Sequence, residues 1–80
     1  MPGLKVYPNP AKELVNITFD NDRKLSHQLR LIGVDGKVLQ QQESRGTSAL
    51  FDLQALPAGV YMLHIGNTEG VHTYTKLIKE

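Results

Sequence analysis

Serine and histidine are neighbours at Ser26-His27, where a nucleophile and its base would be the first chemistry to consider. A hydrolytic site needs both side chains within hydrogen-bond reach, with a third group orienting the base. Neighbouring residues on a β-strand point to opposite faces, and the chain has no G-x-S-x-G motif. The seven glycines stand singly, so a phosphate-binding glycine loop is also missing. We therefore expect no catalytic residue and no enzymatic activity.

The other pair that could do chemistry is His64 and His72. If the "GNTEG" hairpin between them is centred on Thr68, the two imidazoles lie opposite each other on its outward face. Two imidazoles suit a transition metal, but catalytic zinc has three protein ligands and no third candidate follows from the spacing. A slip of one residue in the turn would separate the pair. Two solvated surface histidines are the expectation, a metal site is the alternative, and no cofactor is expected.

The composition limits the class of protein further. Eighty residues make one small domain, and 40% hydrophobic residues with no Trp and no Cys indicate an aliphatic core without disulfides. A net charge of +1 without a basic stripe argues against a nucleic-acid partner. No apolar run reaches the ~18 residues of a membrane span. The start, Met1-Pro2-Gly3, lacks the apolar region of a signal peptide. We expect residues 1–3 to be a cloning remnant or the end of a linker, and residues 4–80 to be the domain.

Apolar and polar residues alternate along most of the chain, which is the period of half-buried β-strands. The pattern predicts no α-helix and seven short strands, near residues 4–7, 15–19, 28–31, 38–43, 49–53, 61–65 and 71–78. The polar 38–43 segment is expected at a sheet edge, and Asp35-Gly36 before it is a strong hairpin signal. Strands at this spacing predict an all-β, immunoglobulin-like antiparallel β-sandwich. Its expected core includes Val15, Ile17, Phe19, Leu29, Leu31, Phe51, Tyr61, Leu63 and Ile65.

The stretch "DLQALPAGVYMLHI" contains a candidate tyrosine corner. Pro57 presets φ for a turn, and Gly59 can supply a positive φ just before Tyr61 opens an alternating strand. In immunoglobulin-like sandwiches a tyrosine at this place bonds back to the upstream backbone. We expect the Tyr61 hydroxyl to donate to a backbone carbonyl near Leu53 to Leu56. The alternative is an ordinary tight turn in which Tyr61 only packs.

Two prolines flank an asparagine at Pro8-Asn9-Pro10, where a β-like run stops and then restarts. Proline fixes φ, lacks the N–H of a strand ladder and drives the preceding residue toward extended geometry. We expect a stiff, extended corner by which a chain from a preceding domain crosses between the sheets. Alternatively, the corner only ends an edge strand and blocks edge pairing.

Four blocks of sequence, "VYPNPA", "DGKVL", "LPAGVYMLHI" and "TKLIKE", resemble in order the type A C-terminal sorting domain of type IX secretion substrates in the Bacteroidetes phylum. The resemblance covers nearly the whole chain. It implies an immunoglobulin-like domain that is not itself an enzyme. This domain would follow a secreted cargo domain and direct that cargo to the outer-membrane translocon. The motif positions fall on Pro8, Asn9, Pro10, Asp35, Gly36, Pro57, Gly59 and Tyr61.

The resemblance also implies partners and a route. The partners are the type IX translocon, a sortase-like surface protease that cuts before the domain, and the cargo domain of the same chain. The route passes the periplasm to the outer membrane and the cell surface. The family's terminal block falls on residues of the last predicted strand, so we expect the recognition surface to be Lys76, Leu77, Ile78, Lys79 and Glu80. The pleat should turn either Leu77 or Ile78 inward and leave the other to a partner.

Two other functions remain open. An adhesive or carbohydrate-binding sandwich appended to a secreted enzyme would stack sugars on exposed aromatic rings. The chain has no Trp, and only Tyr7 and Tyr74 are expected at the surface. A spacer or dimerisation domain would instead use exposed edge strands for weak self-association.

Overall fold

The computed structural model describes residues 3–80, so Met1 and Pro2 of the expected remnant lie outside the described residues. The described chain forms seven β-strands and no helix, and therefore no helix that could cross a membrane. The strands are β1 (Lys5–Tyr7), β2 (Leu14–Thr18), β3 (His27–Ile32), β4 (Val38–Ser44), β5 (Ser48–Asp52), β6 (Gly59–Asn67) and β7 (His72–Lys79). The prediction of seven short strands is confirmed, and no boundary moves by more than two residues.

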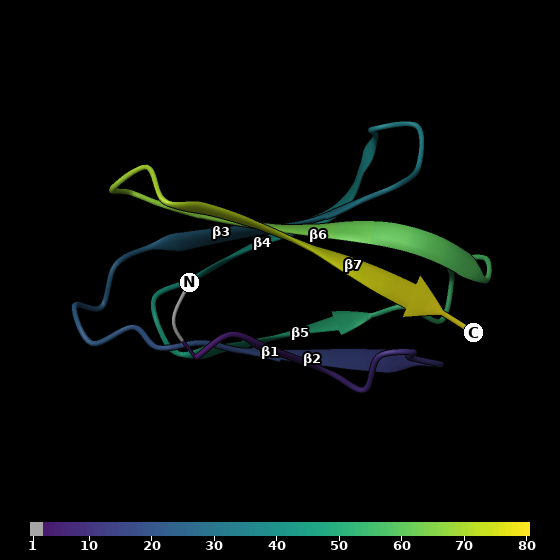
Figure 1. The fold of residues 1–80 in the computed structure, drawn as a ribbon, viewed down its shortest axis with the longest axis horizontal. Helices are drawn as coiled ribbons and strands as arrows, with labels where there is room; N and C mark the ends of the chain where they lie inside the picture. Colours follow the sequence, from purple (N-terminus) through teal and green to yellow (C-terminus); the bar gives the residue numbers. More distant parts are fainter. Residues whose placement is uncertain (1–2) are drawn as a thin grey trace.

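Two antiparallel sheets form the two layers that Figure 1 shows. One sheet has the strand order β1-β2-β5, and the other has the order β4-β3-β6-β7. Strands that follow each other in the chain are therefore often in different layers, as β2 and β3 are. The architecture confirms the predicted all-β antiparallel sandwich.

The core lies between the two layers and is aliphatic, as the composition predicts. All nine residues that alternation assigned to the core are buried, and Ala11, Leu53 and Leu77 join them. The inward faces of β2 and β3 show the reason, because every second residue is buried and the residues between are not. Leu63 at the centre of β6 has no exposed surface.

The Asp35-Gly36 hairpin joins β3 to β4, as predicted. The Gly33 N–H donates to the Lys37 carbonyl at 2.9 Å, and the Lys37 N–H donates to Asp35 Oδ1 at 3.0 Å. Gly36 has a φ of 85°, the left-handed region that glycine adopts without strain. The pairing of β3 with β4 shifts between Leu31 and Ile32, close to this turn.

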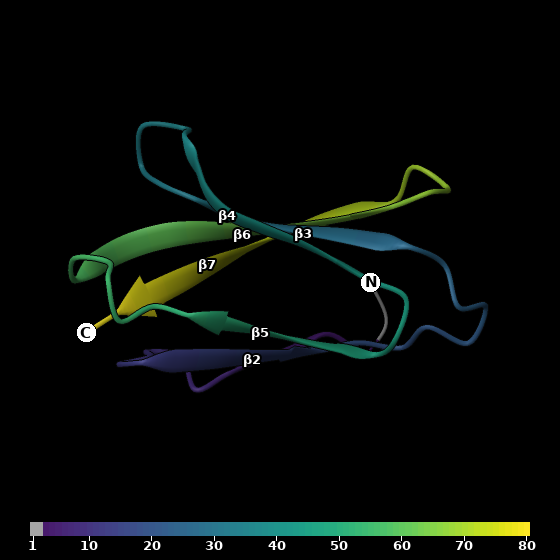
Figure 2. The same ribbon diagram turned by 180° about the vertical axis from the view of Figure 1, so that it is seen from behind.

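Side chains of β4 close the side of the sandwich where the chain passes from β4 to β5. Figure 2 shows this passage from one layer to the other. Gln40 Nε2 donates to the Asp52 carbonyl at 2.7 Å and Gln42 Nε2 to the Leu50 carbonyl at 2.8 Å. The Ser44 hydroxyl donates to the Ser48 carbonyl at 3.2 Å. The polar segment is thus at a sheet edge, as predicted, but its side chains satisfy the edge carbonyls of β5.

Candidate recognition surface

The β7 end carries the residues expected to form the recognition surface. Leu77 is 0% exposed and belongs to the core, whereas Ile78 is 36% exposed on the opposite face. The pleat therefore divides the pair as expected, and Leu77 is not accessible to a partner. Lys76 and Glu80 are exposed with Ile78, while Lys79 lies on the inner side and is half-buried.

The Pro8–Pro10 corner brings the beginning of the chain onto the edge of β7. Asn9 Nδ2 donates to the Lys76 carbonyl at 3.1 Å, and Asn9 Oδ1 accepts from the Ile78 N–H at 3.0 Å. Beyond the corner, the Ala11 N–H donates to the Ile78 carbonyl at 2.8 Å, and the Ala11 carbonyl accepts from the Glu80 N–H at 2.8 Å. Asn9 and Ala11 thus act as a short strand beside β7, to which Ala11 bridges in parallel orientation.

This placement resolves the two expectations for the corner. The chain leaves β1 in one sheet, pairs with β7 of the other sheet and returns to β2, so it does cross between the sheets. It also ends β1, which lies at a sheet edge. The expectation of extended geometry is wrong, because Pro8, Asn9 and Pro10 form a bend.

Tyr61 lies against the turn that precedes β6. Its hydroxyl donates to the carbonyl of Pro57, the residue directly after Leu56, so the expected bond to the upstream backbone is made. Just upstream, Leu53 and Leu56 close a turn of their own, in which the Leu56 N–H donates to the Leu53 carbonyl at 3.0 Å. Gly59 has a positive φ of 157° and begins β6.

Replacing Tyr61 with phenylalanine should lower the free energy of unfolding by about 0.5–1.5 kcal/mol, because the hydrogen bond from its hydroxyl to the Pro57 carbonyl is lost. Urea unfolding of both proteins measures the change. An unchanged midpoint would show that the hydroxyl contributes nothing and that Tyr61 only packs.

His64 and His72 are not directly opposite each other, and that prediction is wrong. The β6–β7 hairpin pairs His64 with Tyr74 and Gly66 with His72, which places its midpoint at Glu69 and not at Thr68. Each partner moves by two residues, so both histidines stay on the same outward face. They are diagonal neighbours, with His64 Nε2 and His72 Nδ1 3.0 Å apart.

Gly66 leaves the space for this diagonal contact. A Cβ at Gly66 would lie 2.7 Å from His72 Nδ1, so a side chain there would displace the His72 ring. The Tyr74 ring covers His64 from the other side, at a centroid distance of 4.7 Å. His64 is consequently only 6% exposed, which corrects the expectation of two solvated histidines.

Arg30 completes a chain of N–H donors across the outer face. It lies opposite His64 on β3, with Nη1 3.3 Å from His64 Nδ1. A guanidinium only donates, so His64 Nδ1 accepts and His64 Nε2 carries the hydrogen that it donates to His72 Nδ1. Both imidazoles are therefore neutral in this arrangement. The His72 Nε2–H lies at the end of this series of hydrogen bonds.

The geometry of the pair does not favour the metal alternative. The ring centroids are 5.1 Å apart and the ring planes are 14° from parallel, which suits a head-on N–H···N bond between nearly coplanar rings. The two nitrogens are thus directed at each other and not at a common third point. Within residues 3–80, no group of three His, Cys, Asp or Glu side chains is placed to hold a metal ion.

Because His64 is neutral in this hydrogen-bonded arrangement, we expect the folded domain to lose stability in acid. Burial lowers the pKa of His64, and the charge of Arg30 lowers it further. The unfolded chain then binds a proton at a higher pH than the folded chain does, so stability falls as the pH decreases from about 6.5 to the folded-state value. Urea unfolding at neutral and mildly acidic pH should show a smaller dependence on pH for His64→Gln than for wild type. Equal dependence in both proteins would contradict the role of His64.

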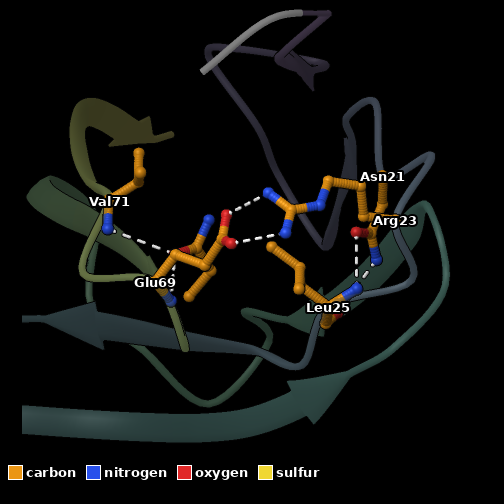
Figure 3. Close-up of polar contacts among 6 residues, drawn as sticks. Asn21, Arg23, Leu25, Glu69 and Val71 are labelled. Carbon is orange, nitrogen blue, oxygen red and sulfur yellow. Dashed lines mark hydrogen bonds and ion pairs between the residues drawn. The ribbon is translucent and has the colours of Figure 1, made fainter.

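Asn21 organises the loop end of the sandwich, as Figure 3 shows in part. Its Nδ2 lies 3.0, 3.1 and 2.8 Å from the carbonyls of Leu25, Arg45 and Gly46, and its Oδ1 accepts from the Leu25 N–H at 2.9 Å. The side chain is buried and ties the β2–β3 loop to the β4–β5 turn. No sequence motif predicts this role for Asn21, since only its place in a polar stretch marks the residue.

A second asparagine, Asn67, shapes the β6–β7 turn beside it. Its Oδ1 accepts from the N–H groups of Glu69 and Val71 at 2.9 and 3.1 Å. Figure 3 also shows the ion pair between Glu69 and Arg23, with Nη2 and Oε2 2.7 Å apart. The ion pair is exposed and contributes little to stability.

The remaining candidate residues are not brought together. His27 is buried with its ring 4.7 Å from that of Phe19, whereas the Ser26 hydroxyl donates to Glu43 at 2.8 Å, so the neighbours do point to opposite faces. Tyr7 and Tyr74 are both exposed, but they lie in different sheets and form no common platform for a sugar.

A protein-family model matches β7 together with almost all of the rest of the chain. The model of the secretion system C-terminal sorting domain matches residues 5–80. The chain belongs to this family. The sorting domain is accordingly a signal by which the type IX secretion system directs a secreted protein, and it is part of a larger cargo chain that is exported to the cell surface or beyond. Sorting domains are a non-catalytic kind of protein module.

Solved structures confirm the fold of the sorting domain as immunoglobulin-like. A DUF3244-family protein with an immunoglobulin-like β-sandwich from Bacteroides vulgatus matches with a TM-score of 0.81 and 18% identity, over 99% of this chain and 86% of that chain. PorZ, an essential surface component of the type IX secretion system of Porphyromonas gingivalis, matches with a TM-score of 0.80 and 19% identity, over 98% of this chain and 11% of that chain. At these identities the likeness concerns the fold alone. The comparison with curated proteins found no match.

Proposed function

We propose that the type IX translocon recognises the sorting domain as a folded module and contacts it at the outer face of the β7 end. The cargo chain passes the periplasm and crosses the outer membrane to the cell surface, where a sortase-like protease cuts before the domain. The domain itself acts without catalysis. The features that the translocon recognises therefore lie on the surface of the domain.

The observation that carries this proposal is the rigid presentation of Lys76 and Ile78. Both side chains lie on the outer face, opposite Met62 and Val60 of β6. The Asn9 side chain binds the backbone of both residues from the other edge of β7. The backbone that carries a positive charge beside an exposed apolar side chain is thus bonded along both of its edges. Of the five expected recognition residues, we assign this role to Lys76, Ile78 and Glu80, since Leu77 is core and Lys79 is half-buried on the inner side.

An export assay tests the proposal. The whole chain is fused behind a periplasmically exported reporter in a bacterium with a type IX system, and surface reporter is measured. Wild type should reach the surface, Lys76→Ala should leave the reporter in the periplasm, and Lys37→Ala should behave as wild type. Both lysines are exposed, so each change should alter the free energy of unfolding by less than about 0.5 kcal/mol.

The result can contradict the proposal at two levels. A folded Lys76→Ala domain exported as well as the Lys37→Ala control would remove Lys76 from the recognition surface. A wild-type fusion that stays in the periplasm would refute recognition of the domain in this host.

A further inference from the structure

The sheet edges of the sorting domain differ in how they are closed. The edge of β5 is bonded by side chains of β4, and the edge of β1 is only three residues long. The edge of β7, which has eight residues, is closed over part of its length by Asn9 and Ala11. These two residues bond to the backbone from Lys76 to Glu80 and reach no further toward the β6–β7 turn.

The other half of the β7 edge is open. Alternate residues of a paired strand direct their N–H and C=O groups away from the partner strand, and the bonds of Asn9 show that Ile78 does so. The register of β6 with β7 runs unbroken from Lys79 to His72, so Tyr74 and His72 direct theirs the same way. Among the described residues no hydrogen-bond partner meets the N–H and C=O groups of Tyr74 and His72 on that side.

We infer that this open half of the β7 edge, from His72 to the N–H of Lys76, takes up an extended strand of a partner protein with acidic side chains on its outer face. Strand addition of this kind draws affinity from main-chain hydrogen bonds and specificity from the flanking side chains. The inference deepens the proposed function, on which it rests, because it states how the translocon would hold the strand that carries Lys76.

The charges along the edge define the chemistry of the added strand. Lys76 and His72 lie on the outer face of β7, and Arg30 lies on the same face two strands away. Neither β6 nor β7 contains an acidic residue. A residue of the added strand opposite Lys76 would have its Cβ about 5 Å from that of Lys76, where an opposite charge stabilises the pair.

A second copy of the chain fits this edge poorly. Antiparallel pairing of two β7 edges about Tyr74 would place each Lys76 opposite the His72 of the other copy. That arrangement offers no acidic partner, and a lysine on an edge strand is a common protection against self-pairing. The same lysine would accept an acidic strand, so the edge discriminates between the two occupants.

Two substitutions at Tyr74 test the inference in the reporter fusion. Tyr74→Pro removes an N–H that points away from β6, so it breaks no bond within the sheet but blocks an added strand. Tyr74→Ala keeps the N–H and loses the same aromatic contact with His64. We expect about tenfold less surface reporter for Tyr74→Pro than for Tyr74→Ala, as the loss of about one hydrogen bond with the partner would give.

Unfolding measurements and a second pair of variants make the result decisive. If Tyr74→Pro does not fold, His72→Pro against His72→Ala repeats the comparison at the first residue of β7, where proline is tolerated. Folded proline and alanine variants exported equally well would overturn strand addition while leaving the proposed function intact. A wild-type fusion that is not exported would instead reject the proposed function. Native mass spectrometry that finds a dimer in wild type but not in Tyr74→Pro would overturn the acidic partner in favour of a second copy.

Discussion

Leu63→Ala should lower the free energy of unfolding by about 2–5 kcal/mol, because a fully buried leucine loses its transfer energy and leaves a cavity. Leu63 has no exposed surface and pairs with Leu31 of β3 at the centre of the core. A domain of this size is stable by roughly 4–12 kcal/mol, so one substitution removes a large part of the total. The midpoint of thermal unfolding should fall by about 10–30 °C.

Leu50→Ala is the matched control for this prediction. Leu50 is also a strand leucine, but half of its surface is exposed on the outer side of β5. We expect it to cost less than about 1 kcal/mol, since surface substitutions rarely have large effects. Similar losses for the two variants, measured by urea and thermal unfolding, would contradict the assigned core.

Asn21→Asp should have an effect of similar size, about 2–5 kcal/mol, although the two side chains have nearly the same shape. The carboxylate presents an acceptor to three carbonyls that the Asn21 amide now binds, those of Leu25, Arg45 and Gly46. Asp20 and Asp22 on either side add repulsion. The loss relative to wild type should shrink at low pH, because a protonated carboxyl regains one donor.

Asn67→Asp provides the control, because Asn67 uses only its oxygen. Its Oδ1 accepts from Glu69 and Val71, and a carboxylate accepts from the same two N–H groups. We expect a change below about 0.5 kcal/mol for this variant. Equal destabilisation by both substitutions would show that the added charge, and not the lost amide donors, is responsible.

Alternation was sufficient to predict the strands and their inward faces. In β2, the side chains of Val15 and Ile17 share one face whatever strand lies beside them, because the pleat is a local property of the backbone. The partner of each strand was not predictable in this way. β2 pairs with β5 and not with β3, the next strand in the chain, and any strand with one apolar face would satisfy the pattern of β2 equally well.

The candidate site was predicted less completely than the fold. The pleat correctly separated Leu77 from Ile78, but the contact of His64 with His72 depends on a hairpin register that the turn sequence left open to a shift of one residue. The acceptor of Tyr61 was expected near Leu53 to Leu56, and only the structure identifies it as Pro57. Register and acceptor choice depend on small differences among local geometries that share one sequence pattern.

The sequence by itself determined that this chain is a β-sandwich, which side chains form its core, and which family it belongs to, because periodicity and motif blocks are properties of short segments. Only the tertiary structure decided which strand edges are closed. Asn9 bonds to Ile78 from 69 positions away, and Gln42 closes the edge of β5 from the opposite layer. The half of the β7 edge that remains open follows from where Asn9 and Ala11 stop, and hydrogen bonds between residues so far apart exist only once both sheets are packed.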